Sequence, residues 1–322
     1  MIIYLGSLIA LELSVKGGLM KRYALVTVSD NGKSRACLEV DGVYFPVSDA
    51  CSRFGGEPLP DTVIGLLAEW EKNKIRLAEL AQKCGSMSTG LDSRSVSVEA
   101  PIQFSGKVLC AGANYYDHIA EMGVKDLRKE AQRLFFFFKP PRNTIVGPGR
   151  TVIYPAESMM FDWEIELAAV IGKCAKRLTL ENALDSVAAY SVAIDLSARD
   201  MNQAPDTFYK LDWVAGKGQD TCCPLGPRLV PAEFIADPQN LGLELSVNGE
   251  VKQQAGTSGM IFDIREQLVI LSRLMTLDPG DVILTGTPAG VGFPKRTFLK
   301  AGDRIDAEIE SIGRLSVEIM SA

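Results

Sequence analysis

Three carboxylates next to apolar segments are the residues best suited to bind a metal ion. Glu164 and Glu166 are separated by one residue in the segment WEIELAAVIG, so a β-strand here places both side chains on one face. Adjacent carboxylates repel and are costly to bury without a cation, and a hard divalent ion is the simplest compensation. Asp195 follows the apolar run Tyr190–Ile194 and is a third candidate ligand. The alternatives are an exposed face of an edge strand for the glutamates and a helix N-cap for Asp195.

The single histidine of the chain lies in a pattern typical of a general base. His118 and Glu121 are three residues apart, so a short helix brings their side chains together. A carboxylate beside an imidazole orients the ring and raises its basicity. The alternative is a solvated pair on the surface.

Two segments that contain glycine are candidate ligand loops. Residues 285–292 (TGTPAGVG) offer hydroxyl and backbone N–H groups, including those of Thr287, but lack the lysine of a P-loop. Lys217 lies between Gly216 and Gly218, which would expose its ammonium group to an anionic ligand. A lysine in a flexible turn is the alternative.

Short β-strands must position most of these residues. Apolar or alternating segments predict strands over residues 107–110, 135–138, 151–154, 164–171, 188–195, 243–247, 282–285 and 304–309. Asn248-Gly249 predicts a hairpin after the sixth of them, and helices are expected near 180–187 and over 264–275. Because strands dominate without regular βα alternation, we expect an α+β, β-rich fold of mixed sheets and not a doubly wound sheet.

The first hundred residues differ from the rest in their sequence patterns. The dipeptide Asp41-Gly42 predicts a hairpin, and an apolar period of 3.6 predicts a helix over 62–83 that is capped by Asp61. The serine-rich residues 85–104 predict a linker. We therefore expect an N-terminal extension over 1–19, a small α+β domain over 20–95 and a catalytic domain over 96–322.

Composition and charge exclude several classes of protein. The 322 residues include 40 acidic and 34 basic side chains, a net charge of −6 that disfavours nucleic acid as a partner. One histidine excludes metal sites built from two or three imidazoles. Seven scattered cysteines without a CxxC pair favour free thiols in a reducing cytoplasm. Residues 1–19 are apolar but carry Glu12 and are too few to span a bilayer, so we expect no membrane partner.

Several segments, taken in chain order, resemble the fumarylacetoacetate hydrolase family over about residues 105–322. They are NYYDHIAEMG, FFFKP, WEIELAAVIG, IDLSARD, GKGQDTCCPLGP, SGMIFDI and LDPGDVILTGTPAGVG. The resemblance implies a mixed-sheet β-roll catalytic domain, a homodimer and one Mg²⁺ or Mn²⁺. It also implies roles for particular residues: metal ligands at Glu164, Glu166 and Asp195, a catalytic dyad at His118 and Glu121, an active-site lysine at Lys217, and substrate contacts at Thr287 and Gly218.

The resemblance implies a metal-dependent hydrolase that cleaves the C–C bond of a 2,4-dioxo acid, such as fumarylpyruvate or a diketo sugar acid. Decarboxylase, isomerase, hydratase and lyase reactions on oxaloacetate-like, dienoate or ureidoglycolate substrates are alternatives, because a fold does not fix a reaction. A non-catalytic binding protein is disfavoured because the acidic triad and the dyad are both present. Residues 124–135 and 202–213 are expected to shape the distal pocket. Within the first of these segments, Arg128, Lys129 and Arg133 would admit an acidic substrate tail or form a solvated surface.

Overall fold

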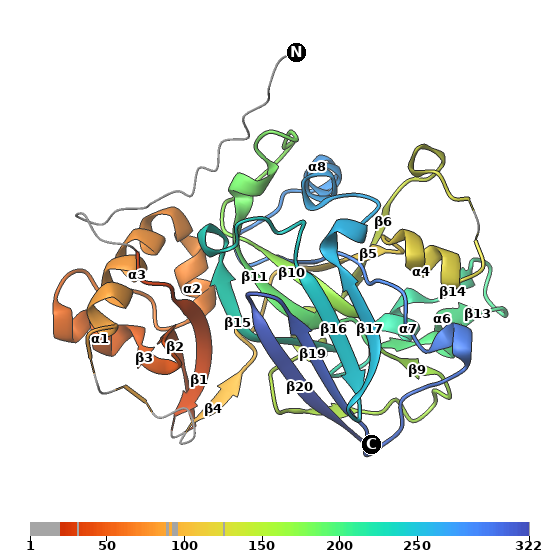
Figure 1. Cartoon of the computed structure of the whole chain (residues 1–322), viewed down its shortest axis with the longest axis horizontal. Helices are drawn as coiled ribbons and strands as arrows, with labels where there is room; N and C mark the ends of the chain where they lie inside the picture. The colour runs from red at the N-terminus through yellow and green to blue at the C-terminus, as the bar shows by residue number, and fades with distance from the viewer. Residues whose placement is uncertain (1–19, 31, 88–89, 92–95, 125, 322) are drawn as a thin grey trace, which may run out of the picture.

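Two β-sheets that pack against each other form the body of the protein (Figure 1). One apolar core includes Leu167 and Val192 from the larger sheet and Leu245 and Leu315 from the smaller one. The computed structural model describes residues 20–30, 32–87, 90–91, 96–124 and 126–321. The predicted extension over residues 1–19 lies outside these described residues.

The larger sheet has eleven strands within the described residues. Nine of them follow the order β3 (Val43–Pro46), β2 (Lys33–Val40), β1 (Ala24–Asp30), β15 (Cys223–Pro231), β11 (Val187–Ile194), β10 (Ile165–Ile171), β18 (Val282–Leu284), β5 (Val108–Gly112) and β6 (Phe135–Lys139). The other two are β4 (Ser97–Glu99), which pairs with β1, and β7 (Ile145–Val146), which pairs with β15. Every residue of β10 and β11 is buried, and this explains their nearly continuous apolar sequences.

The smaller sheet has five strands in the same described part of the chain. Their order is β17 (Glu250–Gly256), β16 (Gly242–Val247), β19 (Arg304–Ile309), β20 (Gly313–Met320) and β8 (Thr151–Ile153). Buried and exposed residues alternate along β19 and β20, because one face of this sheet packs on the core. Asn248 and Gly249 both have positive φ, as a type I′ turn requires, and the predicted hairpin between β16 and β17 is confirmed.

Two short strand pairs and eight helices complete the described structure. The pairs are β9 (Phe161–Asp162) with β12 (Ser197–Ala198), and β13 (Gln203–Ala204) with β14 (Lys210–Leu211). The helices are α1 (Val47–Phe54), α2 (Val63–Ala68), α3 (Trp70–Cys84), α4 (Tyr116–Glu121), α5 (Pro141–Thr144), α6 (Arg199–Asn202), α7 (Trp213–Lys217) and α8 (Ile264–Leu274). The expected α+β, β-rich fold with mixed sheets is confirmed.

Some predicted helices differ from the observed ones. The helix expected over 62–83 is divided into α2 and α3 at Glu69, whose φ of −125° and ψ of 50° are not helical. Thr62, and not Asp61, caps α2 by accepting a hydrogen bond from the Gly65 N–H at 3.2 Å. The helix expected near 180–187 is only a 3₁₀ turn over Ala183–Ser186, because β11 begins at Val187.

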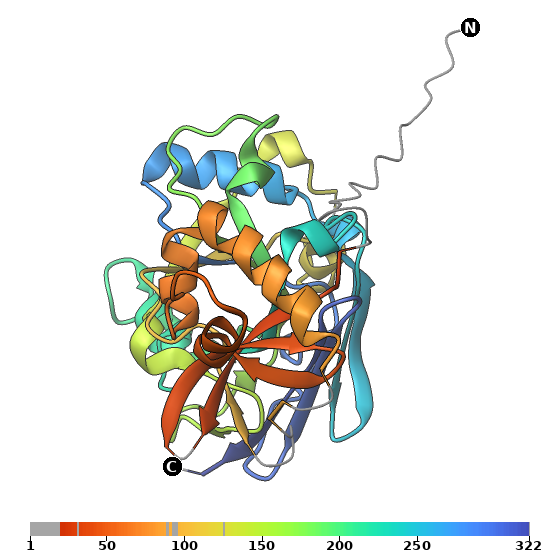
Figure 2. The ribbon, with the colours of Figure 1, turned by 90° about the vertical axis from the view of Figure 1, so that its left-hand side faces the viewer.

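The N-terminal strands β1–β3 and helices α1–α3 lie together at one end of the molecule, where Figure 2 shows them in red and orange. Strand β1 pairs with β15 at Leu25 and Leu229, so the N-terminal strands β1–β3 extend the larger sheet. A second apolar core includes Leu38 and Trp70 from this end together with Val108 and Leu284 from the central strands. The domain boundary between residues 95 and 96 stays a prediction.

Among the described residues, none of the helices combines the length and the apolar character needed to cross a membrane.

Candidate active site

The register of two neighbouring strands brings the three predicted carboxylates together. Glu164 precedes β10, Glu166 lies within it, and Asp195 directly follows β11. Antiparallel pairing places Ile165 opposite Ile194, and the Asp195 N–H donates to the Glu164 carbonyl at 2.8 Å. All three carboxylates are buried, with ligand oxygens within 4.8 Å of one another. Since β10 lies between two other strands, the edge-strand alternative is wrong.

Three cationic side chains contact this carboxylate cluster, which consists of Glu164, Glu166 and Asp195, in the described part of the chain. Lys217 at the end of α7 donates to Glu164 Oε2 at 2.6 Å and to Asp195 Oδ2 at 2.7 Å. Lys139 at the end of β6 donates to the other Asp195 oxygen at 2.6 Å, and Arg199 Nη2 lies 2.5 Å from Glu164 Oε1. Lys217 is therefore held by two carboxylates and is not in a flexible turn.

The positive charges are unevenly distributed over the cluster. Burial alone would raise the pKa of Glu164, but Arg199 and Lys217 lower it below its ordinary value. The pKa of Glu166 is raised well above its ordinary value by burial and by the charges of Asp195 and Glu164. Glu166 forms no ion pair within the described residues; it accepts a hydrogen bond from the Gly286 N–H. The cluster thus lacks positive charge at Glu166.

A divalent metal fits this arrangement. Three buried carboxylates that converge within 4.8 Å form the all-oxygen donor set that hard divalent ions prefer. The charge of such an ion would also relieve the repulsion that raises the pKa of Glu166. Glu164, Glu166 and Asp195 would therefore hold the metal.

Helix α4 presents the histidine and its partner to the same site. His118 Nδ1 lies 2.8 Å from Glu121 Oε1, so the predicted contact within a short helix is confirmed. Glu121 Oε2 accepts a hydrogen bond from the Gly290 N–H at 2.9 Å, which fixes the carboxylate on its other side. His118 is buried, so a solvated surface pair is excluded. With Nδ1 donating to Glu121, Nε2 is left free to accept a proton.

The loop of residues 285–292 connects the cluster with the dyad. Gly286 has a φ of +101°, and a Cβ there would lie 2.7 Å from the Asn114 Cβ; its N–H contacts Glu166. The Thr287 hydroxyl donates to the Ile165 carbonyl at 2.9 Å and accepts from Gln253 Nε2 at 2.8 Å. The glycines of the loop therefore allow backbone N–H groups to reach both Glu166 and Glu121.

One cavity of about 350 Å³ opens onto the cluster and His118, which is room for a small organic acid. Its charged end is lined by His118, Glu164, Glu166, Asp195, Arg199, Lys217 and Thr287. The rest of its lining is mainly apolar, and we call the following residues the apolar wall: Ile119, Met122, Val124, Leu127, Phe135, Phe137 and Trp213.

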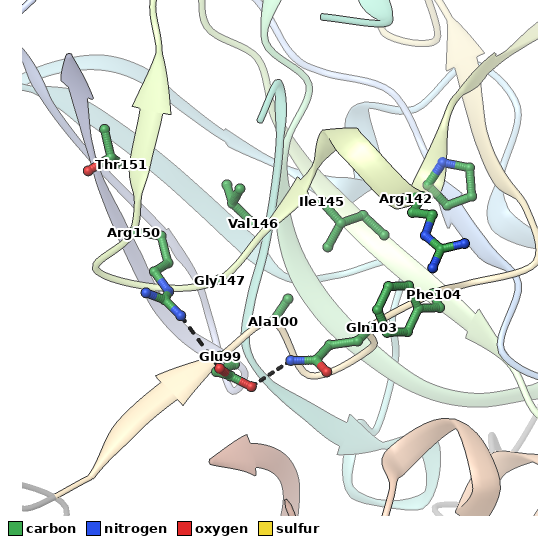
Figure 3. A pocket seen from close by; sticks show the side chains of 11 residues that line it. Glu99, Ala100, Gln103, Phe104, Arg142, Ile145, Val146, Gly147, Arg150 and Thr151 are labelled. Atoms are coloured by element: carbon green, nitrogen blue, oxygen red, sulfur yellow. Dashed lines mark hydrogen bonds and ion pairs between the residues drawn. The ribbon is translucent and has the colours of Figure 1, made fainter. Parts of the chain in front are cut away.

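A larger cavity of about 440 Å³ lies elsewhere, between residues 99–104 and 141–151 (Figure 3). Glu99 accepts a hydrogen bond from Gln103 at 2.6 Å and pairs with Arg150 at 3.5 Å, while Arg142 lies over the Phe104 ring. Of the described residues that line it, Glu99 is the only carboxylate. The cavity therefore offers no set of groups comparable to the cluster and the dyad.

Of two predictions about the substrate pocket, the structure decides the first and leaves the second open. Lys129 lies in a 3₁₀ turn (Lys129–Ala131) and pairs with Glu266 at 2.7 Å, and neither Arg128 nor Arg133 lines the described cavity. These cations therefore do not face the site. Gly218 ends α7 by donating to the Val214 carbonyl at 2.8 Å, and its substrate contact stays a prediction.

Sequence reasoning missed three residues that contact the predicted ones. Lys139 and Arg199 touch the carboxylate cluster, and Gln253 holds both Thr287 and the Ile165 N–H. A signal for Lys139 existed, since a lysine that ends the apolar run of β6 needs a buried partner. Arg199 and Gln253 occupy ordinary polar positions in the sequence and carry no comparable signal.

Comparisons with known proteins give relatives over most of the length of this chain. A protein named oxaloacetate tautomerase FAHD2A from Bos taurus is 40% identical over 79% of this chain and 78% of its own length. Oxaloacetate tautomerase YisK from Bacillus subtilis is 40% identical over 82% of this chain and 88% of its own length. The structure of fumarylpyruvate hydrolase from Pseudomonas aeruginosa, in complex with Mn²⁺ and pyruvate, matches with 33% identity and a TM-score of 0.61 over 68% of this chain and 91% of that one. The model of the fumarylacetoacetate hydrolase C-terminal domain matches residues 107–320, and the chain belongs to this family.

Proposed function

We propose that this protein is a divalent-metal-dependent tautomerase that interconverts the keto and enol forms of an oxaloacetate-type 2-oxo acid. The observation that carries the proposal is one cavity lined by both the carboxylate cluster and His118, whose Nδ1 is held by Glu121. Names of relatives at 40% identity support the tautomerase reaction over the C–C hydrolysis that the sequence led us to expect.

The residues divide the work of a proton transfer between them. His118 Nε2 removes a proton from the carbon next to the 2-oxo group and returns a proton to the oxygen or to the carbon. Glu121 fixes the imidazole ring, and Lys217 adds positive charge where negative charge develops on the substrate. Thr287 lies at the charged end of the cavity, where it would face the substrate carboxylate.

We propose Mg²⁺ or Mn²⁺ as the metal, held by the carboxylate cluster. Bound there, the ion would polarise the 2-oxo group and stabilise negative charge on its oxygen. Support comes from the oxygen donor set and from a structural relative whose description includes Mn²⁺ and pyruvate. A homodimer and a location in the cytoplasm stay predictions.

The test follows the ultraviolet absorbance of the enol form of oxaloacetate as it approaches equilibrium. We expect the protein with Mn²⁺ or Mg²⁺ to accelerate this approach, and EDTA to abolish the acceleration. Because free metal ions also promote enolisation, the same metal concentration without protein is the control. A rate equal to that of the metal-only control would refute the proposal.

A second candidate function is hydrolysis of an acylpyruvate, and the apolar wall favours it. In that reaction water adds to the acyl carbonyl, the C–C bond breaks, and the products are a carboxylic acid and pyruvate. The description of the Pseudomonas aeruginosa relative as a fumarylpyruvate hydrolase gives it further support. Incubation with acetylpyruvate and enzymatic detection of pyruvate distinguishes the two, since tautomerisation releases none.

A further inference from the structure

One side chain in the lining of the active-site cavity has a buried donor that no other described residue uses. Gln132 lines the cavity, and its Nε2 atom is buried without a hydrogen-bond partner. We infer that Gln132 Nε2 binds the second carboxylate of the substrate and thereby selects 2-oxo dicarboxylic acids over acids with one carboxylate. The inference rests on the proposed function, because it takes the 2-oxo acid end to bind at the carboxylate cluster.

The lysine, the arginine and the hydroxyl group that line the cavity are already engaged. Lys217 and Arg199 contact the carboxylate cluster, and the Thr287 hydroxyl donates to a backbone carbonyl. Among the buried side-chain nitrogen and oxygen atoms that line the cavity in the described residues, only Gln132 Nε2 has neither a hydrogen bond nor an ion pair. It is therefore the buried donor that is left for a ligand.

A buried N–H without an acceptor is costly, and proteins contain few of them. The neighbours of Gln132 in the sequence that also line the cavity are Met122, Val124, Leu127 and Phe135, whose apolar side chains offer no oxygen acceptor. An oxygen atom of a bound substrate would satisfy the amide. The unpartnered donor therefore marks a polar position within the apolar wall.

Gln132 is held in place from both directions along the chain. Its N–H donates to the Lys129 carbonyl at 3.3 Å and ends the 3₁₀ turn Lys129–Ala131. Lys129 anchors this turn to α8 through its ion pair with Glu266 at 2.7 Å. Strand β6 begins soon after Gln132 and pairs with β5. The backbone at Gln132 is therefore fixed before a ligand binds, which lowers the entropic cost of binding.

A carboxylate is the acceptor that suits this position best. The three carboxylates of the cluster are matched by three cations, so a divalent ion there leaves two positive charges, which a dianionic substrate would balance. An N–H forms a stronger hydrogen bond with a charged oxygen than with a neutral one. Met122, Val124 and Phe135 are each more than a third exposed, so the apolar wall is partly open to water and a carboxylate beside it keeps part of its hydration.

The experiment compares racemic malate with racemic lactate by calorimetric titration of the Mn²⁺-loaded protein at pH 8. Both acids carry a 2-hydroxyl group in place of the 2-oxo group, so neither enolises during the measurement, and only malate has a second carboxylate. We expect malate to bind at least about tenfold more tightly than lactate, the effect of one hydrogen bond to a charged group. Equal affinities, or tighter binding of lactate, would overturn the inference.

Two substitutions of Gln132 test whether this residue causes the preference. Gln132→Met removes the donor at nearly the same size, and Gln132→Glu replaces it with a negative charge. Malate binding should weaken by about tenfold or more in both variants, while lactate binding should change by less than about threefold. Gln82→Glu is the matched control, because Gln82 lies exposed on α3 and does not line the cavity; both affinities should stay unchanged. Unchanged malate affinity in Gln132→Met would overturn the role of Gln132.

A probe with an apolar tail separates loss of the donor from damage to the apolar wall. The probe is 5-methyl-2-oxohexanoate, which has no second carboxylate for Gln132 to bind. Gln132→Met should bind it no more weakly than the original protein does, because the methionine side chain is apolar and adaptable. Weakening equal to that of malate would show that the substitution disturbs the wall, and would overturn the specific contact.

These measurements separate the inference from the proposed function. Weaker malate binding in Gln132→Met, together with no acceleration of oxaloacetate enolisation by the original protein, would keep the carboxylate contact and reject the tautomerase. Acceleration of enolisation together with unchanged malate binding in the variant would keep the tautomerase and reject the contact. If both hold, Gln132→Met should raise KM for oxaloacetate with little change in kcat, because the second carboxylate is bound equally before and during proton transfer.

Discussion

The two ends of the active-site cavity are built in different ways. The charged end lies where β10 and β11 pair, and Lys139, Lys217 and Arg199 contact two of its three carboxylates, Glu164 and Asp195, at 2.5 to 2.7 Å. The apolar wall comes mostly from the short helix α4, the connection that follows it and the edge strand β6, and part of it is exposed. The difference indicates that the sheet fixes the chemistry, while peripheral segments select the substrate.

The largest effect should come from removing one carboxylate at the charged end. Glu166→Gln should reduce enolisation to the rate of the metal-only control and abolish calorimetric Mn²⁺ binding, because a neutral amide is a poor ligand for a hard cation. The unfolding temperature should not fall, since the change removes repulsion within the cluster. The exposed Glu157→Gln serves as control and should behave like the original protein. Retained Mn²⁺ binding in Glu166→Gln would contradict the assignment.

Loss of the proposed base should have the next largest effect. His118→Ala should slow enolisation by about 10²–10⁴-fold, the range typical of general-base catalysis. Mn²⁺ binding should persist, because His118 is not among the residues of the carboxylate cluster. Glu121→Gln should give a smaller loss, since this residue only positions the ring. Activity of His118→Ala within about threefold of the original would mean that another group moves the proton.

Loss of Lys139 from the charged end should lower the free energy of unfolding. Lys139→Met leaves Asp195 Oδ1 without its cation and should cost about 3–5 kcal/mol in the free energy of unfolding, measured with urea. Burial lowers the pKa of Lys139, but Asp195 raises it above the ordinary lysine value. Because the pKa of Lys139 is higher in the folded than in the unfolded chain, its charged form stabilises the fold at every pH below about 10, the pKa of an unfolded lysine. This contribution to the free energy of unfolding falls only as the pH rises further.

A matched change at the surface provides the control for Lys139. Lys129→Met removes the partly exposed ion pair with Glu266 and should cost no more than about 1 kcal/mol. Similar losses of unfolding free energy in the two variants would show that the buried ion pair stabilises the fold no more than the partly exposed one does.

The smallest effect should arise at the apolar wall. Trp213→Leu removes the ring that stacks on Phe137 and should weaken binding of 5-methyl-2-oxohexanoate by about tenfold. Binding of pyruvate, which is too short to cover the wall, should change by less than about twofold. Equal weakening for both acids would show that Trp213 supports the charged end as well.

The contrast between the two ends also explains what could be predicted from the sequence. The spacing of Glu164 and Glu166 in a strand, and of His118 and Glu121 in a helix, depends only on local periodicity. Most predicted strands are present for the same reason, as with β10, β11 and β16. The position of Asp195 beside Glu164 needed the additional step of pairing two strands.

The remaining features depend on contacts between distant parts of the chain. Lys139 and Asp195 are 56 residues apart, and Arg199 and Asp162 are 37 apart, so no local pattern joins them. A strand was predicted over residues 135–138, but its exposure was not: Phe135 and Phe138 are exposed because β6 is the last strand of the sheet. Residues 124–135 were expected to shape the pocket, and Val124, Leu127 and Phe135 do line the cavity. Local pattern did not show that these apolar side chains, and not the cations of the segment, would line it.

The pairing of β1 with β15 leaves less of the larger sheet open to strands of other molecules. Leu25 of β1 lies opposite Leu229, so this end of β1 covers part of a strand side whose N–H and C=O groups would otherwise be unpaired. Uncovered strand sides recruit strands from other molecules and lead to aggregation. Removal of residues 20–84 would also uncover apolar side chains such as Val108 and Leu284. We therefore expect the N-terminal strands to protect the sheet that carries the active site from aggregation.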